Sequence, residues 1–463
     1  MGPQKGLAKT RVLVFACCSA ALIVFAASAY FYTGIGPYDV PPKSRELDKT
    51  IAESKALGLP MTKEELIGPA PAADKNAAPT VIGAITALEK KVSTKAVKGV
   101  DVNAGNILEQ GAEGQARRDK VAGLSPELDV VVAGLKGRPK WYIDRDYDMF
   151  TELQFPELAQ VKNAGKLFVA RSVLRARHGD VKGSLTDFVA CRQLARHIAQ
   201  EPTMISMLVA IAIDYMAIAS VPYIADEWKD SPPRLAELEE SITDTSEPFD
   251  ILPALRGEFY FALSTTRNLS ALGGIKALTS SGMDRENVPP LDPSTVVRTG
   301  LPNGMFERAS LDVIARNWNT VFESLKNKKQ PYRDWSGPLT KWSKIAESRF
   351  RTSEILALVL APTYSGIDTT LTGSDAYQNV ALAFIRCMEY RAKNHRWPSS
   401  LKEVNADLSD PLANGKPIQA VFAPGSLTVW SVGRNHVDDG GEIRGPNHKT
   451  ADDIALRWPP RKK

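Results

Sequence analysis

The side chains best suited to chemistry are concentrated in one stretch near the C-terminus. Residues 430–458 read WSVGRNHVDDGGEIRGPNHKTADDIALRW and contain two aspartate pairs and two of the five histidines. Carboxylate, amide and backbone carbonyl oxygens are the ligands that a hard cation such as Ca²⁺ collects, usually six to eight at a time. This stretch therefore predicts either a structural cation site or a polar loop held by its own turn hydrogen bonds.

Alternating residues on both sides of this loop predict the strands that position it. Residues 418–422 and 427–432 alternate on either side of a Pro-Gly turn, which is typical of a β-hairpin. Residues 453–458 also alternate and can add a third antiparallel strand. A predicted helix over 375–394, with Val380, Phe384 and Cys387 on one stripe, is expected to cover one face. We therefore expect a small α+β module over residues 373–463.

The order of motifs in this region resembles the C-terminal part of the major pseudopilins of type II secretion. The helix ends in YRAKNHRWP at 390–398, DPLANGKP follows at 410–417, and the acidic loop leads into DDI at 452–454. A weaker likeness, to membrane-anchored proteins of planctomycete-type bacteria, covers most of the chain and includes NAA at 76–78 and GD at 179–180. Unlike the pseudopilins, this chain lacks the GFTLxE start and inserts roughly 340 residues between its apolar N-terminal run and this helix.

The resemblance also implies a set of metal ligands, because the corresponding loop of the pseudopilins binds calcium. The ligands it implies here, beside a carbonyl near Val432, are Asn435, Asp438 or Asp439, Asp452 and Asp453. Asn435 stands where the family pattern has an aspartate, and His436 replaces the glycine that follows it. Since one negative charge is missing, the resemblance implies a weaker calcium site than in the pseudopilins.

Composition excludes several classes of protein. The net charge of +5 is spread over 58 basic and 53 acidic residues, so we expect no nucleic-acid partner. The four cysteines, at 17, 18, 191 and 387, form no CxxC motif and no Cys/His ligand set, which argues against a zinc site. A bridge between Cys191 and Cys387 is one alternative, and two buried free cysteines are the favoured one.

The N-terminal region carries a membrane signal. Residues 12–32 form an uncharged apolar run long enough to cross a bilayer, and the basic residues of the tail 1–11 favour a cytoplasmic N-terminus. A cleaved signal peptide with a small-residue site at 27–29 is the alternative. Both alternatives place the bulk of the chain outside the cytoplasm, and we expect a single-pass protein of the bacterial inner membrane with a periplasmic ectodomain.

A second apolar run, residues 204–225, carries Asp214 at its middle. A carboxylate at the centre of a membrane helix costs about 2.5 to 3.5 kcal/mol. We therefore expect this run to be the buried central helix of a helical domain and not a second span.

The remaining residues predict a mainly α fold: a transmembrane helix, a large helical ectodomain and the small α+β module. We expect a spacer and N-terminal helices over 33–125 and a helical domain over 126–360. Within these ranges the patterns predict helices at 44–57, 74–91 and 306–325 and a helical hairpin turning at 177–180. Segments 93–123 and 272–302 are predicted to be an extended connection and a surface loop.

Two hypotheses about function follow. GxSxG, HExxH, Walker A and GxGxxG motifs are missing from the sequence, so no catalytic residue is assigned. The first hypothesis is a non-enzymatic envelope protein that binds other envelope proteins through its ectodomain. The alternative is an extracytoplasmic hydrolase with a carboxylate site at Asp187 or Asp214, which a deep pocket joining carboxylates around a basic residue would favour.

Overall fold

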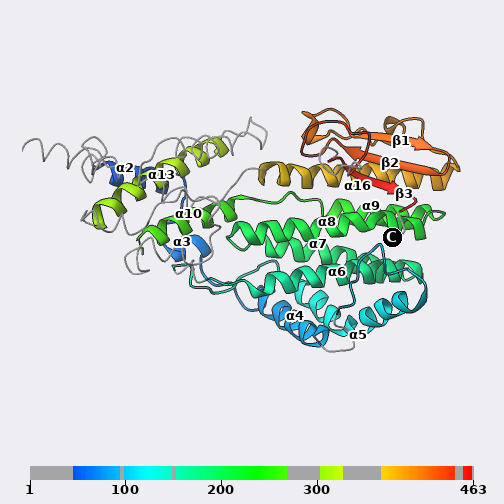
Figure 1. The fold of residues 1–463 in the computed structure, drawn as a ribbon, viewed down its shortest axis with the longest axis horizontal. Coiled ribbons are helices and arrows are strands. Elements are labelled where there is room, and N and C mark those ends of the chain that lie inside the picture. The colour runs from blue at the N-terminus through cyan, green and yellow to red at the C-terminus, as the bar shows by residue number, and fades with distance from the viewer. Residues whose placement is uncertain are drawn as a thin grey trace, which may run out of the picture. The chain divides into compact units, whose positions relative to one another are not determined.

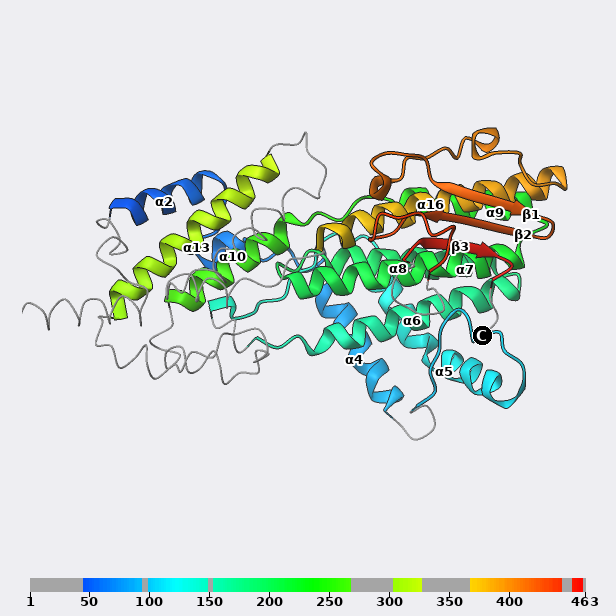
Figure 2. The ribbon, with the colours of Figure 1, turned by 45° about the horizontal axis from the view of Figure 1, so that its top comes forward.

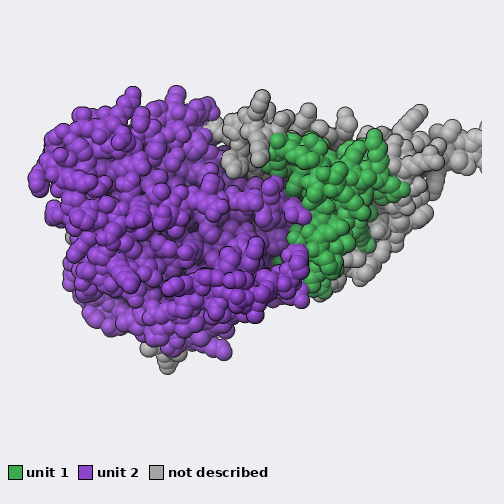
Figure 3. All heavy atoms as spheres, turned by 180° about the vertical axis from the view of Figure 1, so that it is seen from behind, with its two compact units in different colours: residues 1–66, 146–153, 258–365 green, residues 67–145, 154–257, 366–463 purple. Residues whose placement is uncertain are grey.

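The structure, a computed structural model, describes residues 45–93, 99–148, 153–267, 303–326, 367–443 and 452–460. The predicted transmembrane helix at 12–32 and the predicted loop at 272–302 lie outside these residues. The chain divides into two compact units (Figure 3). Unit 1 comprises residues 1–66, 146–153 and 258–365, and unit 2 comprises residues 67–145, 154–257 and 366–463.

Unit 1 contains α2 (Arg45–Ala56), α3 (Lys63–Ile67), the C-terminal part of α10 (Leu252–Arg267) and α13 (Asn303–Lys326). Helix α2 packs on α13 through buried polar side chains. Thr50 Oγ1 donates to Asp312 Oδ1 at 2.7 Å, and Ser54 Oγ donates to Asn319 Oδ1 at 2.7 Å. These two helices confirm the predictions for 44–57 and 306–325.

Unit 2 is built mainly from helices packed in layers (Figure 1). Its first six helices are α4 (Ala78–Val92), α5 (Gly111–Leu135), α6 (Pro156–Arg177), α7 (Val181–Ile198), α8 (Met204–Glu227) and α9 (Pro232–Asp244). Helices α6 and α7 form the predicted hairpin: Gly179 takes a positive φ of 76°, and the Asp180 side chain caps α7 by accepting from the Gly183 N–H. Antiparallel packing after such a short turn aligns the buried stripes of both helices.

Helix α8 lies in the core of unit 2. Within the described residues it is the one helix whose length and composition would let it cross a membrane, and 61% of its most apolar window is buried inside the protein. It packs against α6, α7 and α16 (Ile367–Asn394), and its Asp214 is 3% exposed. The prediction of a buried central helix is confirmed.

One segment differs from its prediction. Residues 111–123, expected to be part of an extended connection, form the first half of α5. The apolar signal is weak there because the first turns are held by charged pairs: Arg117 contacts Glu109 at 2.6 Å and Glu113 at 3.0 Å. Apart from Gly114, the buried residues of α5 begin at Val121, so the periodicity of the first half gives little indication of a helix.

The C-terminal region consists of α16 (Ile367–Asn394), the 3₁₀ turns η3 (Leu401–Val404) and η4 (Pro411–Ala413), and a sheet of β1 (Gln419–Ala423), β2 (Ser426–Ser431) and β3 (Ile454–Trp458). The sheet is antiparallel in the order β1-β2-β3, with Val429 opposite Ala420 and Leu456. Figures 1 and 2 show the strands lying along α16, which contacts β2 and β3. The predicted helix and three-stranded sheet are confirmed.

The compact units group the chain differently from the predicted ranges 33–125, 126–360 and 373–463. Helix α16 belongs to unit 2 together with α4 to α9, because it packs against both α8 and α9. A buried polar contact reinforces this packing: Arg192 Nη2 on α7 donates to Gln378 Oε1 on α16 at 2.6 Å. The α+β region and the helical layers therefore share one core.

The two cysteines in the described part of the chain behave as the favoured alternative predicts. Cys191 and Cys387 are both free and buried. Burial raises the pKa of both thiols, that of Cys387 to about 12, which keeps them protonated and unreactive.

Candidate functional site

The acidic loop, residues 433–443 and 452–453 as far as the structure describes it, folds back over the outer face of the sheet. Trp430 Nε1 on β2 donates to Asp438 Oδ1 at 2.9 Å. A Cβ at Gly441 would stand 2.9 Å from Thr428 Cγ2, so this part of the loop lies directly on β2. At the base of the loop, a Cβ at Gly433 would stand 1.8 Å from the Asp452 carbonyl oxygen, a distance that only glycine permits.

The structure brings the predicted ligand residues together by hydrogen bonds within the loop. Asp439 Oδ2 accepts from Asn435 Nδ2 at 2.8 Å and from the Asp452 N–H at 3.1 Å. Asp452 Oδ2 accepts from the Arg434 N–H at 3.0 Å, and Asp438 Oδ1 also accepts from the Gly440 N–H at 3.0 Å. Much of this loop is thus held by its own turn hydrogen bonds.

Asp453 is the exception, because only one of its carboxylate oxygens is satisfied. Its Oδ2 accepts from the Gly441 N–H at 2.7 Å and from the Asp439 N–H at 3.1 Å. Its Oδ1 is buried and has no hydrogen-bond partner in the described part of the protein. Burial, followed by repulsion from Asp439 and Asp438, raises the pKa of Asp453 to about 6 against the effect of the two N–H donors. A buried, unsatisfied oxygen near two carboxylates is a place that a cation would stabilise.

The side chains of the acidic loop provide only part of the ligands that a metal ion needs. Among the described residues, no group of three or more His, Cys, Asp or Glu side chains is arranged to hold a metal ion. A Ca²⁺ ion at Asp453 would therefore need backbone carbonyls and water for most of its shell, and both are ordinary Ca²⁺ ligands.

The two carboxylates of the hydrolase hypothesis lie inside the helical layers as ion pairs. Asp187 accepts a bidentate pair of hydrogen bonds from Arg171, at 2.6 and 2.8 Å, and a third from Arg175 at 2.9 Å. Asp214 accepts from Arg192 Nε at 2.9 Å. Asp187, Asp214 and Arg192 are all buried. Because the partners of both carboxylates are arginines within the core, the arrangement is that of structural ion pairs.

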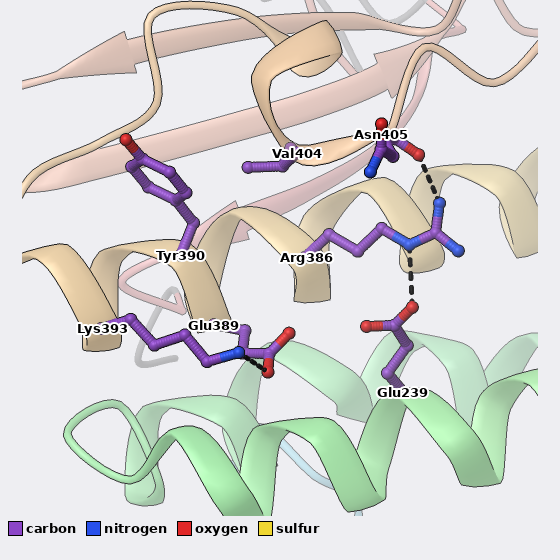
Figure 4. A pocket seen from close by; sticks show the side chains of 7 residues that line it. All are labelled: Glu239, Arg386, Glu389, Tyr390, Lys393, Val404 and Asn405. Carbon is purple, nitrogen blue, oxygen red and sulfur yellow. Dashed lines mark hydrogen bonds and ion pairs between the residues drawn. The ribbon is translucent and has the colours of Figure 1, made fainter.

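A hollow of about 380 Å³ lies on the surface between α9, α16 and the end of η3 (Figure 4). Its charged groups neutralise one another: Arg386 contacts Glu239 at 2.8 Å, and Lys393 contacts Glu389 at 2.6 Å. Neither this hollow nor a smaller one beside α5 is lined by Asp187 or Asp214. Neither hollow is therefore the deep carboxylate pocket that would favour a hydrolase.

The sequence patterns did not identify Asp410 as the residue that holds the start of the acidic loop. Asp410, in the DP motif, is buried and accepts from the Ser431 hydroxyl at 2.9 Å and from the Val432 N–H at 3.0 Å. It thereby ties the start of the acidic loop to η4. An aspartate directly before a proline is the only sequence signal for this role, and it indicates a turn without naming the partner.

Comparison with known proteins adds no further constraint. No protein-family model matches the chain, no curated protein matches it, and no solved structure matches it.

Proposed function

We propose that the chain is a non-enzymatic, single-span envelope protein whose extracytoplasmic helical layers and pseudopilin-like end bind other envelope proteins, with a calcium-binding acidic loop. The apolar run at 12–32 supports the membrane anchor, and the motif order of residues 373–463 supports the pseudopilin-like end. The enclosure of Asp187 and Asp214 by arginines favours this function over a hydrolase.

The observation that carries the calcium proposal is the unsatisfied Oδ1 of Asp453. Asp453 Oδ1 and the Asp439 carboxylate would hold the ion, which would supply the positive charge that the loop lacks. Asp438, Asn435 and Asp452 shape the loop around these two residues through the turn hydrogen bonds described above. A bound ion would then stiffen the surface that the loop presents beyond the sheet.

Thermal unfolding of the purified protein in Ca²⁺ and in chelator tests this proposal. A ligand that binds only the folded state adds about 2.7 kcal/mol at a hundred times its Kd, so the midpoint should rise with Ca²⁺. For Asp453→Asn we expect a higher midpoint than the parent in chelator, because a repelled buried charge is removed. The same variant should lose the response to Ca²⁺.

The matched control is Asp407→Asn, an exposed aspartate in the same region and outside the loop. It should keep the full Ca²⁺ response. A flat midpoint in the parent at millimolar Ca²⁺, or a response that survives Asp453→Asn, would show that the acidic loop is only a turn.

A further inference from the structure

A smaller hollow in unit 2, about 90 Å³, lies between the end of α4, residues 100–102, α5 and α6. Its aliphatic lining is formed by Val92, Val100, Val102 and Leu167. Two lysines, Lys120 from α5 and Lys166 from α6, also line it. An apolar hollow with a few convergent polar groups is the usual form of a small-molecule site.

Lys120 is partly buried, and its ammonium group forms one hydrogen bond within the described residues. Its Nζ donates one hydrogen bond, of 2.7 Å, to the Val100 carbonyl, whereas an ammonium group has three donors. Burial lowers the pKa of Lys120, Asp101 and Glu89 oppose this effect, and Lys166 adds to it. The amine is therefore held in a setting that an additional negative charge would stabilise.

Two carboxylates, Asp101 and Glu89, lie near the lysines of the hollow. Lys166 Nζ lies 3.6 Å from Asp101 Oδ1, but the Asp101 side chain is 67% exposed, so solvent screens this pair. Asn163, which also lines the hollow, donates to Glu89 Oε1 at 2.9 Å. The two lysines are thus the cationic groups at the edge of the aliphatic hollow, and Asp101 and Glu89 are the carboxylates near them.

We propose that this hollow binds a small aliphatic carboxylate, with Lys120 and Lys166 holding the carboxylate and the valines and Leu167 enclosing the chain. The size of the hollow suits a ligand of a few heavy atoms, and butyrate is a suitable probe. For a ligand of this size we expect a Kd on the order of millimolar. The proposal is independent of calcium and of the membrane anchor.

Competitive labelling of the full-length protein with acetic anhydride, read out for each lysine by mass spectrometry, tests this site. At about ten times Kd, butyrate should slow the acetylation of Lys120 about tenfold, because a bound carboxylate blocks the amine and raises its pKa. Exposed Lys162 on α6, outside the hollow, is the internal reference and should be unaffected. Equal protection of both lysines, or none, would overturn the proposal.

Variants and ligand analogues sharpen the test. Lys120→Met and Lys166→Met should each abolish saturation transfer from protein to butyrate in NMR, and Lys162→Met should preserve it. If Lys120→Met does not fold, as judged by circular dichroism, Lys166→Met alone decides.

Neutral butyramide and inorganic phosphate should protect Lys120 less than butyrate. Equal protection by butyramide would remove the role of charge, and equal protection by phosphate would remove the role of the aliphatic walls; either result contradicts the proposal.

Discussion

At the scale of single residues, burial raises the pKa of several carboxylates of unit 2 more than neighbouring hydrogen-bond donors and positive groups lower it. Asp375 on α16 is the clearest case: burial raises its pKa to about 6, Arg196 opposes the shift and Asp214 adds to it. Arg196 stacks on Phe249 at 3.7 Å, and its buried Nε has no hydrogen-bond partner in the described structure. The carboxylate and the guanidinium are thus near each other without a direct bond that would offset the burial.

We expect Asp375 to make stability depend on pH. A carboxyl group with a raised pKa in the folded state contributes stability that is complete below its unfolded value of 3.8 and is lost as the pH rises through about 6. Asp375→Asn removes this dependence, so the variant should match the parent below pH 4 and exceed it by up to about 3 kcal/mol above pH 7. Urea unfolding at both pH values measures the difference. A constant difference between the two proteins would show that Asp375 does not titrate in this range.

At the scale of elements, the helical layers and α16 are joined by a buried arginine. Arg192 on α7 donates to Asp214 on α8, to Gln378 on α16 and to the Ile242 carbonyl at the end of α9. One guanidinium on α7 thus donates to acceptors on three other helices, and these hydrogen bonds favour one arrangement of the four helices. Aliphatic packing alone would allow these helices to slide past one another.

Replacement of this arginine should be costly. Arg192→Met leaves the Asp214 carboxylate buried without its main partner, and we expect a loss of about 3 to 5 kcal/mol in the free energy of unfolding. Adding Asp214→Asn should recover part of this loss, because the uncompensated charge is removed. Exposed Lys182→Met, also on α7, is the control and should change stability by less than about 0.5 kcal/mol. A cost below 1 kcal/mol for Arg192→Met in denaturant titration would contradict this role.

At the scale of the whole molecule, the predicted anchor at 12–32 would hold the chain at the membrane. Alkaline carbonate extraction should leave the full-length protein in the membrane pellet, because an apolar helix of this length stays in the bilayer. Removal of residues 1–33 should release the chain into the soluble fraction. The intact mass distinguishes the anchor from a signal peptide: a mature protein that begins after residue 29 would replace the anchor with a cleaved signal.

The sequence alone determined the elements whose signals are local. The hairpin at 177–180, the strands of the C-terminal sheet and the apolar stripe of α16 all follow from turn residues and from periodicity over a few neighbours. Among the described residues, the first half of α5 differs from its prediction, since charged pairs and not an apolar stripe hold it.

The tertiary structure decided which groups meet. Asp187 and Asp214 read as candidate catalytic carboxylates until their arginine partners are seen, and those partners come from helices 12 to 22 residues away. The four aspartates of the acidic loop look equivalent in sequence, yet among them only Asp453 keeps a buried oxygen unsatisfied. Burial and pairing depend on contacts between distant segments, and local periodicity specifies which face of an element is apolar but not what that face will touch.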